Sequence, residues 1–256
     1  MVKISDKLNQ LLKKPISISE KFHNRTKIKR LDKNPADPSK WPKAWSTVFF
    51  KEYARLDKIL LPEPATLDKI SLEKALRGRK SSREFSKNPI SLEELSTLLY
   101  YSGGLKTNTP PYLADRFYPS AGARYPLEVY LISQNTELPN GLYHYNLRSH
   151  GLEVLEKWEE FNPDKYFNQE FINKAGVIFL TTAVFFRNSM KYSNRGYRHI
   201  LMEAGHLAQN FWLVSASLNL GICGVGGFTD DKLNALLEID GISEAVLNVF
   251  VIGKIR

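Results

Sequence analysis

The 256-residue sequence contains a single cysteine, Cys223, so it cannot form a disulfide within the chain. The five histidines lack the spacing of metal-binding helices, and Cys223 has no second thiol nearby, which argues against the common zinc sites. The longest apolar-rich stretch, residues 200–225, is interrupted by Glu203, His206 and other polar side chains that a membrane span rarely carries. We therefore expect a soluble, cytoplasmic protein without a metal site and without insertion into a membrane.

The sequence also lacks a Walker phosphate loop and a GxSxG nucleophile elbow. The glycines between Gly221 and Gly227 superficially match a dinucleotide-binding fingerprint. They lack the strand–loop–helix context and the acidic residue about twenty positions further on that such a site requires. A Rossmann-type nucleotide site is therefore not expected.

Positive charge is concentrated in the first quarter of the chain. Residues 1–71 contain 16 Lys and Arg against 8 Asp and Glu, whereas the rest of the chain has 20 and 19. Such an arm could attract nucleic acid, acidic lipid or an acidic protein, or be only a solvated Lys-rich segment. No nucleic-acid-binding motif accompanies the charge, so we expect no specific nucleic-acid partner.

Prolines divide the chain into two parts. Five of them interrupt residues 35–64, and regular helical patterns begin only near Ser71. We expect a basic, extended N-terminal arm over residues 1–66, with short helical pieces, and one domain over residues 67–256. The aromatic residues of the arm are expected to pack on the body of the protein: Trp41, Trp45, Phe49, Phe50 and Tyr53.

The second part mixes helices with strands. Ser71 and the capping box that begins at Ser91 predict two helices, and apolar spacing predicts a long helix over residues 197–218 and a short one near residues 231–237. Strands are expected at residues 127–132, 142–145, 152–155, 176–182 and 246–252, and the glycine-rich residues before the last helix are expected to form a connection. The meander of short strands predicts an α+β fold with a mostly antiparallel sheet flanked by helices.

Three cations and two hydroxyls lie within the five residues Arg79 to Arg83. Arg presents a planar fork of donors to phosphate oxygens, and Ser adds a short neutral donor, although a solvated basic turn has the same composition. The cluster resembles the Arg-Arg-Ser-x-Arg signature of the nitroreductase family, with Lys80 in place of the second Arg. In that family the signature binds the phosphate of flavin mononucleotide, FMN, so the resemblance implies this role for Arg79, Lys80, Ser81 and Arg83.

Three further segments resemble the same family in the same order along the chain. They are Tyr118 to Tyr130, which resembles the SagB-type dehydrogenase branch, Glu203 to Asn210 in the long helix, and Gly224 to Phe228. The resemblance covers roughly residues 67–253 and implies a nitroreductase-like fold, FMN as the cofactor and a homodimer that involves the long helix.

Small residues in two of these segments would let the backbone approach a flat ring. The resemblance implies that the flavin ring is bound by Ser120, Ala121 and Gly122, and by Gly226 and Gly227, with the Gly227 amide facing flavin N5. Tight turns alone would also account for these glycines.

A Lys–Tyr pair, Lys191 and Tyr192, lies between a predicted strand and the long helix. SagB-type azoline dehydrogenases carry such a pair at the matching place, where it is associated with oxidation of peptide thiazolines and oxazolines to azoles. The resemblance implies base-assisted hydride transfer to flavin N5, with Lys191 as the base and Tyr192 orienting the substrate or relaying the proton. An exposed Lys beside a packed Tyr is the alternative without catalysis.

Three functions remain open from the sequence. The first is a SagB-type oxidoreductase that acts on a heterocycle, peptide-borne or free, together with biosynthetic partner proteins. The second is an NAD(P)H-dependent nitro- or quinone-reductase, which needs no base. The third is a flavin-binding subunit without turnover of its own, docked to a partner through the basic arm.

Overall fold

The structure is a computed structural model that describes residues 17–28, 40–47, 49–67, 70–106 and 115–255. Much of the predicted arm lies outside the described residues, including Lys29 and Arg30 at the end of its densest basic run and the prolines Pro35 and Pro38.

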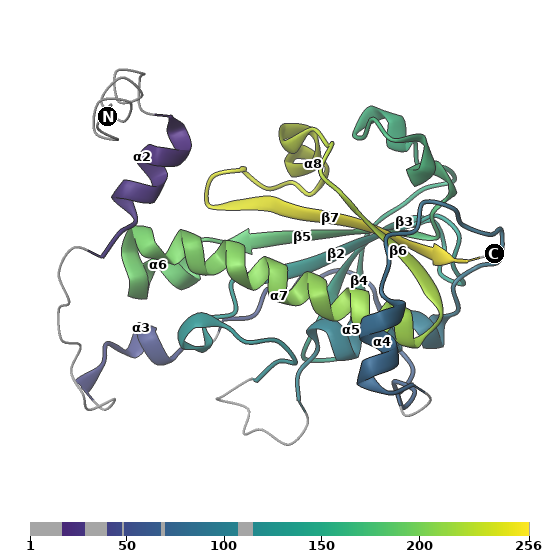
Figure 1. The fold of residues 1–256 in the computed structure, drawn as a ribbon, viewed down its shortest axis with the longest axis horizontal. Helices are drawn as coiled ribbons and strands as arrows, with labels where there is room; N and C mark the ends of the chain where they lie inside the picture. Colours follow the sequence, from purple (N-terminus) through teal and green to yellow (C-terminus); the bar gives the residue numbers. More distant parts are fainter. Residues whose placement is uncertain (1–16, 29–39, 48, 68–69, 107–114, 256) are drawn as a thin grey trace, which may run out of the picture.

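A seven-stranded sheet forms the centre of the molecule (Figure 1). Its strands are β1 (Lys58–Leu60), β2 (Leu127–Ser133), β3 (Gly141–Asn146), β4 (Gly151–Lys157), β5 (Val177–Val184), β6 (Leu220–Val225) and β7 (Glu244–Lys254). They lie in the order β1-β4-β3-β2-β5-β7-β6, and every neighbouring pair is antiparallel. The α+β fold with an antiparallel sheet is therefore confirmed.

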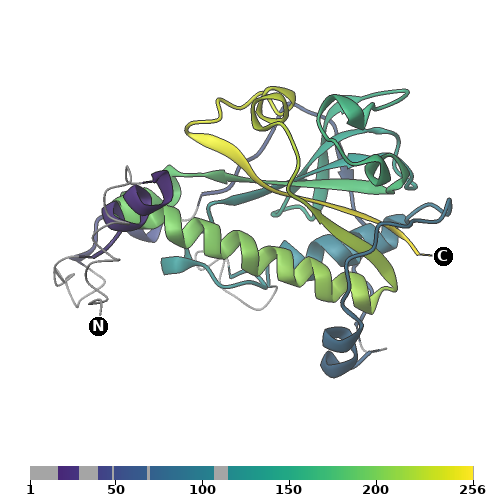
Figure 2. The same ribbon diagram turned by 45° about the horizontal axis from the view of Figure 1, so that its top comes forward.

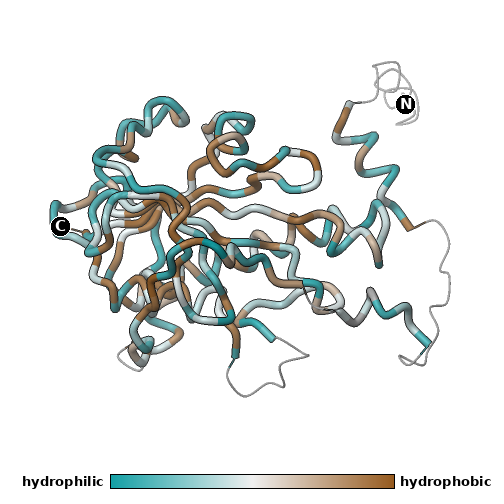
Figure 3. Tube along the Cα trace, turned by 180° about the vertical axis from the view of Figure 1, so that it is seen from behind, coloured by the Kyte–Doolittle hydropathy of each residue, from teal (hydrophilic) through white to brown (hydrophobic). Residues whose placement is uncertain are grey.

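Helices and loops cover both faces of this sheet. Figure 2 shows the long helix α7 (Gly196–Ser217) on one side and the short helix α8 (Asp230–Leu236) on the other. On the α7 side, Phe179 of β5 packs against Phe211 of α7 and Phe250 of β7, with ring centroids 4.9 and 5.4 Å apart. The apolar residues gather along these central strands in Figure 3, and β5 is buried along almost its whole length because elements cover both faces of the sheet.

Local capping signals mark the starts of the two helices between β1 and β2. Helix α4 (Leu72–Gly78) begins after Ser71, whose hydroxyl accepts from the Lys74 amide. Helix α5 (Leu92–Gly103) begins after Ser91 in a complete capping box with Glu94 and packs its leucines beneath the sheet. Helices α5 and α7 lie side by side, and each buries its apolar face in the core.

One sequence-based prediction is wrong, because the residues expected to form only a glycine-rich connection include strand β6. Residues Leu220–Val225 pair with β7 along their whole length. Glycine is used here for close packing: a Cβ on Gly221 would lie 2.6 Å from an Ile255 methyl and 2.9 Å from the Ser82 Cβ. Few β-branched side chains mark the strand, so composition alone conceals it.

The described part of the arm contains α2 (Ile18–Arg25) and α3 (Lys43–Ser46), and β1 joins it to the sheet edge. Helix α2 rests on the start of α7, where Phe22 packs edge-on against Tyr197 and Arg198 donates to the Thr26 hydroxyl. Phe49 packs on Phe186 at a centroid distance of 5.4 Å. Contacts with the body therefore hold the described arm.

Short 3-10 helices complete the described elements. They are η2 (Ala121–Ala123), η3 (Pro163–Lys165), η4 (Glu170–Lys174) and η5 (Ser193–Arg195), and one further α-helix, α6 (Phe186–Tyr192), follows β5. Among the described residues, no helix is long and apolar enough to cross a membrane, and no cluster of His, Cys, Asp and Glu could hold a metal ion.

Candidate active site

The Lys–Tyr pair lies at the end of α6, directly after the central strand β5. In the antiparallel register of β2 and β5, Leu127 lies opposite Ala183. The residues that precede β2 and those that follow β5 must therefore meet at the same end of the sheet. This register brings the segment from Ser120 to Gly122 against Lys191 and Tyr192, although about seventy residues separate them in sequence.

Gly122 is the point of contact between the two segments. Its φ of +63° lies in the left-handed region that favours glycine, and a Cβ built there would lie 2.4 Å from the Tyr192 hydroxyl and 3.1 Å from Lys191 Nζ. Any larger residue at position 122 would displace the pair. Arg124 locks the turn by donating from Nε to the Gly122 carbonyl at 2.9 Å.

The arm covers the other side of Lys191. Its Nζ lies 4.2 Å from the centre of the Trp41 ring and 5.7 Å from that of Trp45. Burial lowers the pKa of the Lys191 ammonium, and the nearby Arg124 guanidinium lowers it further. Burial raises the pKa of the Tyr192 phenol, against the opposing effect of Arg124. Burial thus favours the neutral form of both side chains.

A buried carboxyl supports the same segment from α7. The Ser120 hydroxyl donates to Glu203 Oε2 at 2.6 Å while it accepts from the Tyr125 amide at 2.9 Å. Glu203 is only 1% exposed and its Oε1 has no hydrogen-bond partner among the described residues. Burial raises the pKa of Glu203 to about 7, although the Ser120 hydroxyl and the Arg116 charge oppose the shift.

Helix α6 is anchored to the sheet by a chain of buried charges. Arg187 contacts Glu128 of β2 at 2.5 Å and donates to the Tyr125 carbonyl at 3.2 Å. Glu128 in turn contacts His144 of β3 at 3.3 Å, and His144 contacts Glu153 of β4 at 2.8 Å. Burial would raise the pKa of Glu128, but His144 and Arg187 outweigh it and hold the pKa at about 2.

The predicted phosphate-binding residues lie elsewhere, at the β6 edge of the sheet. The Ser82 amide donates to the Ile222 carbonyl at 2.8 Å, which holds the segment from Arg79 to Arg83 against β6. Arg79, Lys80 and Arg83 are exposed and form no ion pair with a described residue. A hollow of about 210 Å³ lies beside Arg79 and Lys80.

Gly226 and Gly227 follow β6 on the same edge. A Cβ on Gly226 would meet nothing within 4 Å, whereas one on Gly227 would lie 2.3 Å from Gln169 Nε2 and 2.5 Å from Asn168 Oδ1. The Gln169 side-chain oxygen is buried without a partner among the described residues. Arg83 stands 5.9 Å from the Phe171 ring, so the cations and these glycines border the same short segment.

The predicted site residues therefore form two groups along α7. The first group consists of the segment from Ser120 to Gly122 and the Lys–Tyr pair. It lies beside the first half of α7, where Ser120 is hydrogen-bonded to Glu203. The hollow beside Arg79 is lined by Ala216 near its end, and thirteen residues of helix correspond to roughly 20 Å. Figure 1 shows α6 at one end of α7 and α4, which leads into the cations, towards the other.

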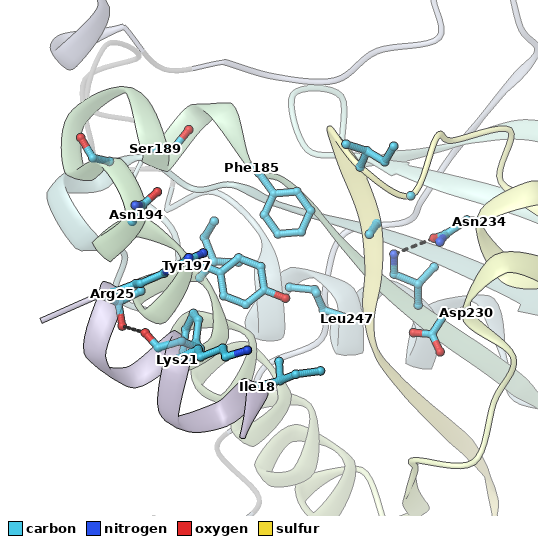
Figure 4. A pocket seen from close by; sticks show the side chains of 18 of the residues that line it. Ile18, Lys21, Arg25, Phe185, Ser189, Asn194, Tyr197, Asp230, Asn234 and Leu247 are labelled. Atoms are coloured by element: carbon cyan, nitrogen blue, oxygen red, sulfur yellow. Dashed lines mark hydrogen bonds between the residues drawn. The ribbon is translucent and has the colours of Figure 1, made fainter. Parts of the chain in front are cut away.

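A second, wider hollow contains none of these residues. It measures about 850 Å³ and lies between α2, the start of α7 and the turn around Gly241 (Figure 4). Lys21 and Arg25 border it on the α2 side, and Asp230 borders it on the α8 side. The hollow depends on how α2 rests on the body and is separate from the Lys–Tyr pair.

Sequence reasoning gave no site role to several residues that lie around the pair, namely Glu203, Arg124, Arg187, Trp41 and Trp45. For Trp41 and Trp45 it predicted only that they pack on the body of the protein. Glu203 left a usable signal, because a Glu in line with the buried Ile200 and Leu207 interrupts an apolar helical face. The contact of Trp41 with Lys191 left none, since 150 residues separate them.

The sequence is similar to a known family of proteins. The model of the family described as "Nitroreductase family" matches residues 76–254. The protein described as a nitroreductase, MJ1384 of Methanocaldococcus jannaschii, is 34% identical over 187 residues, which cover 71% of this chain and 90% of that protein.

Two further similarities involve microcin proteins of Escherichia coli. The microcin B17-processing protein McbC is 30% identical over 178 residues, which cover 66% of this chain and 64% of McbC. A chain in the structure of the microcin synthetase McbBCD complex with truncated pro-MccB17 bound shares the fold with a TM-score of 0.60. It is 24% identical, and the alignment covers 93% of this chain and 92% of that chain.

Proposed function

Because the chain belongs to the nitroreductase family, we propose that it is an FMN-dependent dehydrogenase of SagB type that oxidises a thiazoline or oxazoline ring. The observation that carries the proposal is the Lys191–Tyr192 pair, half-buried and packed against the Gly122 turn. The similarity to McbC, a protein that processes microcin B17, supports a heterocycle carried by a peptide.

The residues at the β6 edge fit an anionic, flat cofactor. Arg79, Lys80 and Arg83 form a cluster of exposed cations without an acidic partner among the described residues, a suitable arrangement for a phosphate. The open space at Gly226 and the unpartnered Gln169 oxygen leave room and a polar contact for a planar ring. We propose that Ser81 adds a phosphate donor and that Gly227 offers its amide to the ring.

The other part of the cofactor site is the segment Ser120, Ala121 and Gly122, which we propose lies beside the reacting face of the flavin. When bound, FMN supplies the acceptor for two electrons and a hydrogen. The amine of Lys191 removes a proton from one ring carbon of the substrate. The electrons of that carbon–hydrogen bond form the new ring double bond, while a hydride leaves the adjacent ring carbon.

The surroundings of Lys191 suit its proposed role as the base. A base must be neutral before it accepts a proton, and burial together with Arg124 lowers the pKa of the Lys191 ammonium. The Tyr192 hydroxyl lies within contact distance of the same turn and orients the substrate ring or passes the proton on. Arg187 and its buried partners hold α6 in place while the substrate binds.

The exposed surface of the chain bears on its oligomeric state. The outward side of α7 exposes Leu201 and Met202 near its start, and α4, which lies towards the other end of α7, exposes Leu72 and Leu76. Exposed apolar side chains of this size are a common feature of contacts between subunits. We propose a homodimer through this face. Partner proteins of a biosynthetic complex are a further proposal, supported by the McbBCD assembly.

Reduction of a nitro group or quinone by NAD(P)H is the second candidate. The similarity to MJ1384, described as a nitroreductase, favours it. It would use the same FMN but would not need Lys191, because neither substrate gives up a carbon-bound proton.

The proposal is tested by the cofactor and its reduction. Purified protein should be yellow and should release FMN, not FAD, on denaturation. A peptide that contains a thiazoline should bleach the flavin absorbance under anaerobic conditions and be converted to the thiazole. Failure to bind any flavin, or bleaching by NAD(P)H but not by the thiazoline peptide, would contradict the proposed dehydrogenase.

A further inference from the structure

Three aromatic rings lie around Lys191, and two of them come from a distant part of the chain. Its Nζ lies 4.2 Å from the centre of the Trp41 ring, and the Trp45 and Tyr192 rings follow at 5.7 Å each. A cation within about 6 Å of an indole face is stabilised by the quadrupole of the ring, and Trp gives the strongest effect of the natural side chains. Trp41 is thus the principal aromatic contact of the Lys191 ammonium.

Two hydrogen bonds hold this part of the arm against the site. The Trp45 indole donates to the Met190 carbonyl at 3.2 Å, directly before Lys191 in α6. Arg124 donates through Nη1 to the Thr47 carbonyl at 2.9 Å, and the same guanidinium fixes the Gly122 turn. The arm is therefore tied both to the helix that carries Lys191 and to the turn that faces it.

Two opposing influences then act on Lys191. Burial and the Arg124 charge favour its neutral form, whereas the Trp41 ring favours the charged form. Among the described residues, no carboxylate lies within 4 Å of Nζ to balance the charge. Trp41 is thus the nearest of the three aromatic rings that stabilise a positive charge on Lys191.

We propose that Trp41 of the N-terminal arm is a positioning residue of the active site, which holds Lys191 over the Gly122 turn and stabilises the ammonium formed when Lys191 takes the substrate's proton. This inference rests on the proposed function of Lys191 as the base. It makes the arm a component of the site, a role distinct from any docking through its charge.

The test compares two replacements of similar bulk in the full-length, FMN-loaded protein. Trp41→Leu removes the aromatic face but keeps an apolar side chain, and Trp41→Phe keeps an aromatic face. Phe49→Leu is the matched control in the same arm, because Phe49 packs on Phe186 and contacts no ring around Lys191.

The measurements are the pH profile of flavin reduction by the thiazoline peptide and the titration of Lys191 by NMR of the side-chain nitrogen. The Lys191 signal is assigned by its loss in Lys191→Arg. NMR is needed because Arg124, Tyr192 and His199 also face this region. The His199 ring lies 5.0 Å from Tyr192, and burial and Arg195 lower its pKa.

We expect Trp41→Leu to lower the pKa of Lys191 by about half a unit, to move the acidic limb of the rate profile down with it, and to slow the alkaline plateau about two- to fivefold. Trp41→Phe should recover most of both effects, and Phe49→Leu should match the wild type.

An unchanged or raised pKa of Lys191 in Trp41→Leu would overturn the inference, since Trp41 would then only exclude water. A lowered pKa without movement of the rate profile would instead contradict Lys191 as the base, so the two failures are distinguishable.

Discussion

The two groups of site residues differ in how the protein holds them. Around Lys191, contacts within the chain fill the space, from the Gly122 turn on one side to Trp41 on the other. At the β6 edge, Arg79, Lys80 and Arg83 are exposed and have no acidic partner among the described residues. The first region is preorganised by the fold itself, and the second is arranged for a group that must come from outside the chain.

Substitutions in the two regions should therefore have different effects, on the stability of the fold in one and on cofactor binding in the other. Changes to the buried ion pairs that anchor α6 should alter the stability of the folded protein, because removal of one member leaves the other buried without a partner. Changes at the β6 edge should alter cofactor binding and leave the fold intact, because the side chains there are already solvated.

The largest effect is expected from Glu128, the acid that joins α6 to the sheet. Glu128→Gln removes the charge that pairs with Arg187 and His144, and breaking a buried ion pair costs about 3–5 kcal/mol. Unfolding by urea measures the loss. The exposed Glu156 provides the control Glu156→Gln, and equal stability of both variants would show that the buried charges do not hold α6.

A pH-dependent effect is expected from Glu203. Burial raises its pKa to about 7 in the folded protein, above about 4.3 in the unfolded chain. The native state therefore binds this proton more tightly, and the resulting stability is present below about pH 4 and is lost as the pH rises through about 7.

Glu203→Gln should remove that dependence, which amounts to about 3 kcal/mol across this range. Urea unfolding between pH 4.5 and 7.5, at a fixed degree of FMN loading, compares the slopes of wild type and variant. The exposed Glu160 supplies the control Glu160→Gln, which should keep the wild-type slope. A Glu203→Gln slope equal to that of the wild type would place the carboxyl in contact with water.

Substitutions of Arg79 and Arg83 test the role of the β6 edge in cofactor binding. Each Arg→Ala change should weaken FMN binding by about 1.5–3 kcal/mol for every charged hydrogen bond lost. The free energy of unfolding without FMN should stay within about 0.5 kcal/mol of wild type, because both side chains are exposed. Fluorescence titration of the apoprotein with FMN gives the affinity, and unchanged affinity in both variants would reject the phosphate role.

Two glycines provide the smallest and most closely matched comparison. Gly122→Ala forces a side chain into a left-handed turn and against the Tyr192 hydroxyl, at a cost of about 1–2 kcal/mol. Gly226→Ala places a methyl group in open space, so its effect on stability should be below about 0.5 kcal/mol. Thermal unfolding without FMN should separate the two variants, and equal losses would contradict the difference between the regions.

Local patterns in the sequence predicted much of the fold. Ser71 and Ser91 marked the starts of two helices because capping depends only on neighbouring residues. Strand β6 was missed because its glycines serve contacts with Ser82 and Ile255 that no local pattern reveals.

The site could be predicted only in part for a related reason. Lys191 and Gly122 were each named from the sequence, but their contact depends on the register of β2 against β5. Trp41 was expected to pack on the body, yet its position over Lys191 depends on the path of the arm, which composition does not determine.

The most direct test of the central claim is anaerobic stopped-flow bleaching of the bound flavin in Lys191→Ala, with a thiazoline peptide and NADH as alternative electron donors. We predict that reduction by the thiazoline falls by about 10²–10⁴-fold, the usual contribution of a positioned base. FMN content and any reduction by NADH should stay near wild type, as should both reactions in Lys174→Ala, a control at an exposed lysine. An undiminished rate with the thiazoline would contradict Lys191 as the base, and equal losses with both donors would indicate damaged flavin binding instead.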